Sequence, residues 1–103
     1  MNVIANVSKN SQLTRGKNYV VIGLDDTYFR IVNDSGEPTL YPRRAFTVTD
    51  DTVPHDWIWQ HFDDGEFYAA PPELSSVGFY ERYFDHDEEA VTIFNHYIKK
   101  VTS

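Results

Sequence analysis

Three of the chain's four histidines lie within two residues of an acidic residue, namely His55, His61 and His86, and this is the first pattern in the sequence that suggests chemistry. His61 and Asp63 stand two residues apart, so on a strand they project to the same face, and His86 lies between two aspartates. A transition-metal site usually needs three or four converging ligands. Because no HExxH or HxH spacing occurs, we expect no metal site.

Adjacent carboxylates are the second such pattern. Asp50/Asp51 and Asp63/Asp64 can support acid–base hydrolysis if a pocket raises the pKa of one member of a pair. Both pairs fall in predicted turns, where water solvates them. The sequence also has no cysteine, no GxSxG and no phosphate-binding glycine loop. We therefore expect a protein that is not an enzyme and uses no cofactor.

The length and composition predict one domain spanning residues 1–103. The chain has 41% apolar and 16% aromatic residues, enough for a single core. A composition shift near residues 49–54 is the only candidate boundary, and it leaves too little chain on either side for two cores. The N-terminus lacks a secretory pattern, and no apolar run approaches the roughly 20 residues of a membrane helix. We expect a cytoplasmic protein that does not enter the membrane.

The net charge of −7 is unevenly distributed along the chain. Residues 1–49 carry six Lys/Arg and four Asp/Glu, whereas residues 50–103 carry three Lys/Arg and twelve Asp/Glu, a net charge of −9. An acidic surface repels phosphate backbones and attracts basic partners, chiefly by speeding their encounter. We expect a basic protein partner and no direct binding of nucleic acid, with the Arg43-Arg44 pair as the one opposing feature.

The elements that must position these residues are mostly short strands. Residues 1–12 predict a short strand or a loosely docked arm. Runs of β-branched and aromatic residues, separated by turn-forming residues, then predict further strands at residues 19–24, 28–32, 39–41 and 46–49. Strands at this spacing favour a small antiparallel barrel or meander. Both faces of residues 19–24 are apolar, with Val21 and Gly23 on one side and Leu24 on the other, so this strand should be central.

A hairpin is predicted over residues 56–70, where "WIWQHF" and "EFYAAP" flank a "DDG" turn. A two-residue loop at Asp64-Gly65 pairs Phe62 with Phe67, His61 with Tyr68 and Trp59 with Ala70. One face then shows Ile58, Gln60, Phe62, Phe67 and Ala69, and the other shows Trp57, Trp59, His61 and Tyr68. Asp63 faces Glu66 across the turn, a like-charge pair that is unfavourable in a ladder.

After a turn-rich "PPELSSVG" connector, which allows one helical turn at "PPEL", a C-terminal helix is predicted over residues 86–101. Asp85 is a suitable N-cap with Glu88 three residues later, and Lys99-Lys100 suit the last turn. An apolar stripe that should dock on the sheet follows helical spacing. Its members are Ala90, Val91, Phe94, Tyr97, Ile98 and Val101.

One face of the hairpin suffices for a core, so we interpret the other face and its acidic turn as the partner-binding surface. Its predicted residues are Trp57, Trp59, His61, Asp63, Asp64, Glu66 and Tyr68. Two alternatives apply to six aromatic residues of the chain: they line a groove for a proline-rich peptide or a cage for a methylated ammonium, or they simply fill the core of a small barrel. The six are Tyr19, Tyr28, Tyr41, Trp57, Trp59 and Tyr68.

Residues 13–48, "LTRGKNYVVIGLDDTYFRIVNDSGEPTLYPRRAFTV", resemble the SH3-like barrel domains of small bacterial proteins. The "GKxYxV" start, the "NDSGEP" loop and the "YPxxxF" turn carry this resemblance, which covers about a third of the chain. It implies an α+β, mainly β fold: an SH3-like antiparallel barrel over residues 13–49 with an added β-hairpin and a C-terminal α-helix. The ALYDY-like peptide-binding segment of signalling SH3 domains is missing.

The whole layout, a short acidic chain with a small barrel and an appended helix, also resembles the immunity proteins that bacteria encode beside secreted toxins. The resemblance implies a non-enzymatic, acidic immunity or inhibitor protein that neutralises a basic bacterial toxin. Two alternatives remain open at this point. One is a small-ligand- or metal-binding protein, and the other is a structural subunit that homo-oligomerises through unpaired strand edges.

Overall fold

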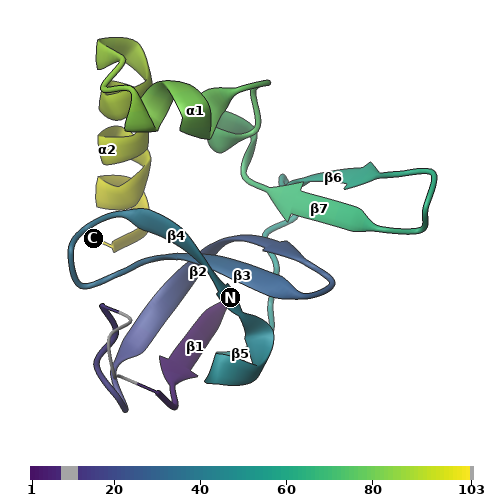
Figure 1. The fold of residues 1–103 in the computed structure, drawn as a ribbon, viewed down its shortest axis with the longest axis vertical. Coiled ribbons are helices and arrows are strands. Elements are labelled where there is room, and N and C mark those ends of the chain that lie inside the picture. The colour runs from purple at the N-terminus through teal and green to yellow at the C-terminus, as the bar shows by residue number, and fades with distance from the viewer. Residues whose placement is uncertain (8–11, 103) are drawn as a thin grey trace. The chain divides into compact units, whose positions relative to one another are not determined.

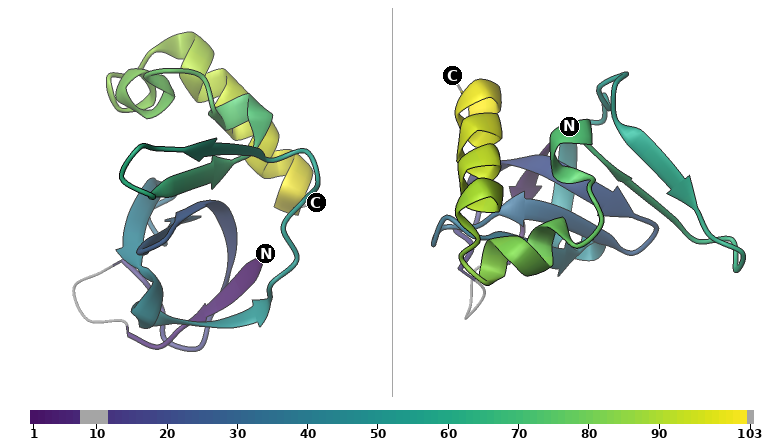
Figure 2. Two further views of the ribbon diagram at one scale, coloured as in Figure 1. Left: turned by 90° about the vertical axis from the view of Figure 1, so that its right-hand side faces the viewer. Right: turned by 90° about the horizontal axis from the view of Figure 1, so that it is seen from above.

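The structure, a computed structural model, describes residues 1–7 and 12–102 (Figures 1 and 2). It divides the chain into two compact units, Met1–Ala70 and Pro71–Ser103. The division does not fall at residues 49–54, the boundary that the composition suggested. Each unit buries apolar side chains of its own, while the expectation of a single domain stays a prediction.

The first unit consists of antiparallel strands, and the predicted α+β, mainly β class is confirmed. Its strands are β1 (Asn2–Ala5), β2 (Asn18–Asp25), β3 (Tyr28–Val32), β4 (Pro38–Pro42), β5 (Phe46–Asp50), β6 (Ile58–His61) and β7 (Phe67–Ala70). A short 3-10 helix, η1 (Arg43–Ala45), connects β4 to β5. The main path of the sheet runs β4-β3-β2-β1-β5, and β7 pairs with β2 on one side and β6 on the other. Between the described strands β4 and β5 no pairing closes this path into a ring.

The N-terminal segment provides an inner strand. Within the predicted segment 1–12, residues 8–11 lie outside the described residues, and Asn2–Ala5 form β1 between β2 and β5. Val3 and Ala5 are almost completely buried there. Residues 2–5 are therefore a strand of the sheet rather than part of a loosely docked arm.

Strand β2 is central, as its two apolar faces predicted, but its alternation contains a break. Val21 pairs with Ile31 and Gly23 with Arg30, so one residue of β2 is extra and forms a β-bulge. The bulge brings Val21 and Leu24 to the same core, although simple alternation placed them on opposite faces. The eight residues of β2 give room for β1 at Asn18–Val20 and for β7 at Leu24 and Asp25.

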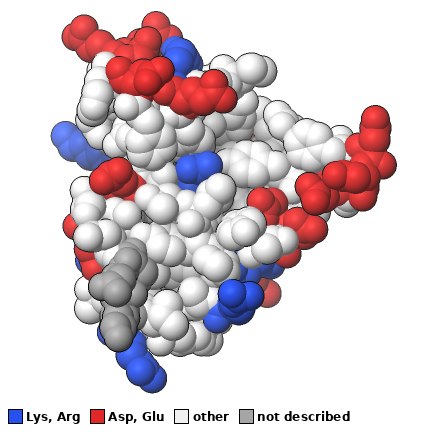
Figure 3. Space-filling view, viewed as in Figure 1, with Lys and Arg blue, Asp and Glu red and all other residues white. Residues whose placement is uncertain are grey.

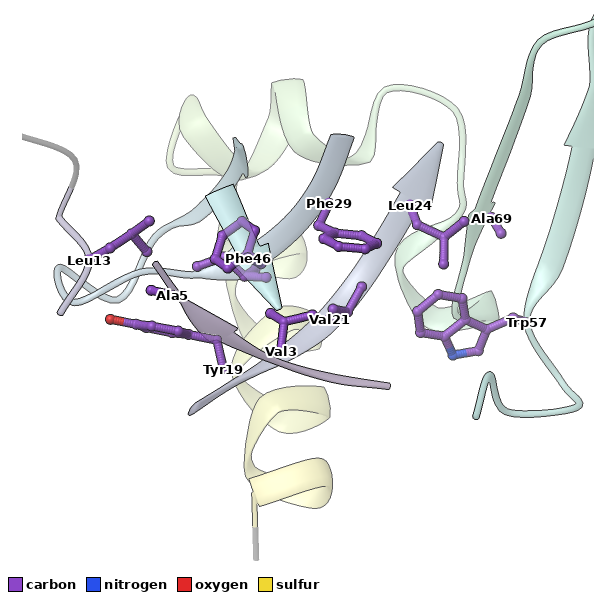
Figure 4. Close-up of a cluster of buried hydrophobic side chains, with 11 residues drawn as sticks. Val3, Ala5, Leu13, Tyr19, Val21, Leu24, Phe29, Phe46, Trp57 and Ala69 are labelled. Atoms are coloured by element: carbon purple, nitrogen blue, oxygen red, sulfur yellow. The ribbon is translucent and has the colours of Figure 1, made fainter. Parts of the chain in front are cut away.

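The core of the first unit is drawn from five of its strands, β1, β2, β3, β5 and β7, and from the segments before β2 and β6 (Figure 4). Its buried members are Val3, Ala5, Leu13, Tyr19, Val21, Leu24, Phe29, Ile31, Phe46, Trp57 and Ala69. The rings of Phe29 and Phe46 lie 6.0 Å apart. Since Phe29 is 1% exposed, replacing it with alanine should cost about 3–5 kcal/mol of stability.

The second unit is helical. It comprises a 3-10 turn, η2 (Pro72–Leu74), and two helices, α1 (Phe79–Phe84) and α2 (Glu88–Thr102). The turn at "PPEL" was predicted, whereas α1 was not. The rings of Tyr83 and Phe94 lie 4.7 Å apart and pack the two helices together.

Helix α2 begins two residues later than predicted, and its N-cap is Asp87 rather than Asp85. The Asp87 carboxylate accepts a hydrogen bond of 3.0 Å from the backbone N–H of Ala90. Asp85 instead ends α1, and His86 takes a left-handed conformation, with φ of 63°, between the two helices. Ala90, Phe94 and Tyr97 of the apolar stripe are buried. That the stripe docks on the sheet stays a prediction.

Candidate functional site

The β6–β7 hairpin projects beyond the other strands of the first unit (Figures 1 and 2). Its base is held by Trp57, which is only 5% exposed and lies beside Leu24 and Ala69 in the core (Figure 4). Trp57 was predicted to be a partner-binding residue. Because its ring is buried, its role in the structure is to fix the hairpin to the sheet.

The predicted pairing of the hairpin is wrong by one residue. Trp59 pairs with Ala69, Gln60 with Tyr68 and His61 with Phe67. The reason is a loop of three residues instead of two. A shift of one residue moves side chains to the opposite face, so Tyr68 does not share a face with Trp59 and His61.

The turn itself consists of Asp63, Asp64 and Gly65. The N–H of Phe62 donates to the carbonyl of Glu66 (2.9 Å), and the N–H of Gly65 donates to the carbonyl of Phe62 (3.0 Å). Gly65 has φ of 86°, the left-handed conformation that ends three-residue hairpin loops. Phe62, not Asp63, therefore faces Glu66, and the predicted like-charge pair across the ladder does not form.

The hairpin exposes more apolar surface than the sequence predicted. Trp59 is 47% exposed, as expected for a binding residue, and its ring lies 5.6 Å from that of Phe67. Ile58 and Phe62, which we had placed on the core face, are 44% and 51% exposed. The polar Gln60 between them was the signal in the sequence that this face is not buried.

Tyr68 occupies a supporting position rather than an open one. It is half-buried, and its hydroxyl oxygen would lie 2.9 Å from a Cβ atom added at Gly23. The absence of a side chain at Gly23 therefore lets the Tyr68 ring approach β2 closely. This contact helps to seat β7 against β2.

The three predicted acidic residues, Asp63, Asp64 and Glu66, are all exposed at the turn, and acidic side chains cover this end of the hairpin (Figure 3). Asp64 also accepts a hydrogen bond of 3.0 Å from the backbone N–H of Glu66. In the described part of the chain, none of the ion pairs involves these three carboxylates. No lysine or arginine occurs anywhere in residues 45–81. The negative charge of the turn is thus available to a partner.

The groups considered for metal binding and hydrolysis do not converge. His55, His61, His86 and His96 are all exposed, and within residues 1–7 and 12–102 no three His, Cys, Asp or Glu side chains are grouped to hold a metal ion. The pKa of Asp50 is lowered because the backbone N–H and the side chain of Thr52 donate hydrogen bonds to its carboxylate. This shift is opposite in direction to the one that a general acid needs.

Comparison of the chain with protein-family models, with curated proteins and with solved structures finds no match. The helices in the described ranges are too short or too polar to span a bilayer.

Proposed function

We propose that this chain is a non-enzymatic protein-binding module, an acidic immunity or inhibitor protein that neutralises a basic bacterial toxin in the cytoplasm. One observation carries the proposal: the projecting hairpin presents exposed Trp59 and Phe62 next to an acidic turn that has no ion pair with any described cation. Exposed large apolar groups rimmed by charge are typical of protein interaction sites.

We further propose that the SH3-like barrel expected over residues 13–49 is formed by β2–β5 together with β1, which lies outside that range. Three features support this finer assignment: the strand order β4-β3-β2-β1-β5, the 3-10 turn between β4 and β5, and the bulge that bends β2. In this proposal the barrel serves as a scaffold, and the added hairpin supplies the binding surface. Fold likeness alone does not specify the partner.

The two kinds of hairpin residue would act on different steps of binding. Complementary charge speeds diffusional encounter, so the carboxylates of Asp63, Asp64 and Glu66 should set the association rate. Buried aromatic anchors slow dissociation, and this role falls to Trp59 and Phe62. A basic, nucleic-acid-binding toxin offers a cationic surface that suits both the carboxylates and the aromatic anchors.

The test begins with affinity capture from extracts of the source cell, using the full chain as bait, followed by identification of the captured protein. Association rates with that protein are then measured at low and high salt for the D63N/D64N/E66Q variant. We expect the variant to associate about tenfold more slowly at low salt and to match the wild type at high salt.

The matched control is D85N/E88Q/E89Q in the second unit, which removes the same number of charges. It should change the association rate much less. The proposal is wrong if the captured protein is not basic, or if the two variants slow association equally. Trp59→Ala should raise the dissociation rate, with a loss of about 2 kcal/mol in binding free energy if Trp59 is an anchor.

A further inference from the structure

Strand β6 has one edge that is free of backbone pairing within the described chain. It pairs with β7 alone, and all four of its residues are exposed. Since the N–H of Phe62 donates to Glu66, antiparallel alternation directs the backbone groups of Gln60 toward β7 and those of Trp59 and His61 away from it. Within residues 1–7 and 12–102, no backbone hydrogen bond outside the β6–β7 ladder engages Trp59 or His61.

The other outer strands of the first unit carry features that discourage pairing. Strand β4 begins with Pro38 and ends with Pro42, and β5 ends at Asp50, which Asp51 follows. Proline and charge are the usual protection of sheet edges. Strand β6 contains neither a proline nor an acidic or basic residue other than His61. Its edge is therefore the open one.

The side chains around this edge suit an added strand. Ile58 and Phe62 lie on one face of the hairpin, and Trp59 and His61 lie on the other. A strand added to β6 would place alternate side chains beside Ile58 and Phe62 on one face and beside Trp59 on the other. A cationic side chain on the second face would also reach the ring of Trp59.

Charge decides between a second copy of this chain and a different partner. The hairpin and its approach carry Asp56, Asp63, Asp64 and Glu66, and residues 45–81 contain no cation to oppose them. A second copy would bring the same acidic residues to this edge. Repulsion between the acidic residues of the two copies therefore disfavours a second copy and favours a cationic partner.

We propose that the free edge of β6 binds an extended, cationic segment of the partner by β-strand addition. The backbone groups of Trp59 and His61 would pair with the segment, and Asp63, Asp64 and Glu66 would hold its basic side chains. This inference rests on the proposed function and names the form in which the basic partner is recognised.

The test uses the full ¹⁵N-labelled chain and a defined probe: an acetylated, amidated octapeptide in which arginine and valine alternate. When the probe is near saturation, amide exchange at Trp59 and His61 should slow by about tenfold. The exchange of Gln60, whose N–H is directed toward β7, should change little. The fully N-methylated octapeptide keeps the side chains and charge, but it has no N–H to donate to the carbonyls of Trp59 and His61, and its methyl groups prevent close approach to the edge. It should therefore not protect these amides.

A matched pair of variants tests the same contact from the protein side. His61→Pro removes an N–H that points away from β7, a position where an edge strand tolerates proline, and His61→Ala keeps that N–H. The proline variant should bind the octapeptide at least about fivefold more weakly than the alanine variant, the effect of one lost hydrogen bond. The wild-type exchange experiment remains decisive if the proline variant does not fold.

Three outcomes would overturn the inference. The first is no binding up to about 1 mM octapeptide. The second is binding that leaves the Trp59 and His61 amides unprotected, which means that the acidic residues alone hold the peptide. The third is concentration-dependent protection of these amides in the free chain, which means that a second copy occupies the edge. None of these outcomes alters the charge test of the captured partner, so failure of the two proposals is distinguishable.

Discussion

At the scale of single residues, Asp34 is the most highly connected carboxylate in the described chain. It accepts hydrogen bonds from Lys17 Nζ (2.9 Å), the Thr14 hydroxyl (2.8 Å) and the Tyr19 hydroxyl (2.8 Å). Tyr19 in turn accepts a hydrogen bond of 2.7 Å from the backbone N–H of Thr14. The network ties the segment before β2 to the turn after β3.

This network predicts a pH dependence of stability. The pKa of Asp34 is lowered from 3.8, first by the hydrogen bond from Lys17 and then by those from Thr14 and Tyr19, whereas the pKa of Lys17 is raised from 10.5 by Asp34. The Asp34 contribution is therefore present above pH 3.8 and is lost as the pH falls through its folded-state value. The Lys17 contribution is present below pH 10.5 and is lost as the pH rises through its folded-state value.

Urea unfolding from about pH 2 to about pH 7 measures the acid side of this dependence. In Asp34→Asn the loss of stability below pH 3.8 should be shallower than in the wild type. Parallel curves for the two proteins would contradict the assignment.

Gly23 gives a second prediction at this scale. A Cβ atom at this position would lie 2.9 Å from the Tyr68 hydroxyl oxygen and 3.4 Å from Arg30 Cβ. Gly23→Ala should therefore cost about 1–3 kcal/mol in unfolding free energy, the usual penalty of overpacking. Tyr68→Phe removes the closest atom, so the double variant should lose less than the two single variants together. If the losses of unfolding free energy in the two single variants sum to the loss in the double variant, the contact with the Tyr68 hydroxyl is not what makes an alanine at this position unfavourable.

At the scale of elements, local sequence predicted the strands well. The predicted runs at 19–24, 28–32, 39–41 and 46–49 fall inside β2, β3, β4 and β5. β-branched and aromatic content bounded by turn residues is a local signal, and each of these strands has it. The bulge in β2 and the loop length of the hairpin are set by cross-strand partners, which no local pattern specifies.

The candidate site shows the same contrast between features that the local sequence specifies and features that distant residues specify. Asp63, Asp64 and Glu66 were predicted at an exposed turn and are found there, because turn chemistry is local. Trp57 was predicted at the surface and is buried, because its environment includes Leu24, which lies far away in the sequence. The exposure of Phe62 was missed because one face of the hairpin was assigned to the core, whereas all four residues of β6 are exposed and neither face of that strand is buried.

The cap of α2 can be tested with a matched pair of substitutions. Asp87→Ala removes the hydrogen bond to the Ala90 N–H and should cost about 1 kcal/mol. Asp85→Ala removes an equal charge two residues earlier, at the end of α1, and should cost clearly less. Thermal unfolding of both variants measures the difference. Equal losses would mean that charge near the helix, and not the hydrogen bond, stabilises its start.

At the scale of the whole molecule, the net charge of −7 opposes folding through self-repulsion. The three carboxylates of the hairpin turn add to this repulsion and have no ion-pair partner in the described residues. Neutralising them in D63N/D64N/E66Q should leave the unfolding midpoint unchanged or raise it by about 1–4 °C at low salt. The D64N substitution keeps a side-chain oxygen, so the hydrogen bond from the backbone N–H of residue 66 can still form.

Added salt screens the repulsion between these charges. The difference in unfolding midpoint between this variant and the wild type should therefore disappear at high ionic strength. Scanning calorimetry or thermal unfolding followed by circular dichroism, at two salt concentrations, measures this difference in midpoint. A midpoint clearly below that of the wild type would mean that these acidic residues stabilise the fold, and would weaken the argument that they are reserved for a partner.

The inner position of β1 has a consequence for biosynthesis. This strand is translated before the other strands described, but it pairs on one side with Phe46–Asp50, which is translated some forty residues later. At about 5–20 residues per second, the ribosome needs about 2–9 s to deliver that second partner. During this interval the nascent chain holds Val3 and Ala5 without their native cover. The order of the strands along the chain thus sets the time during which a chaperone can bind the growing chain.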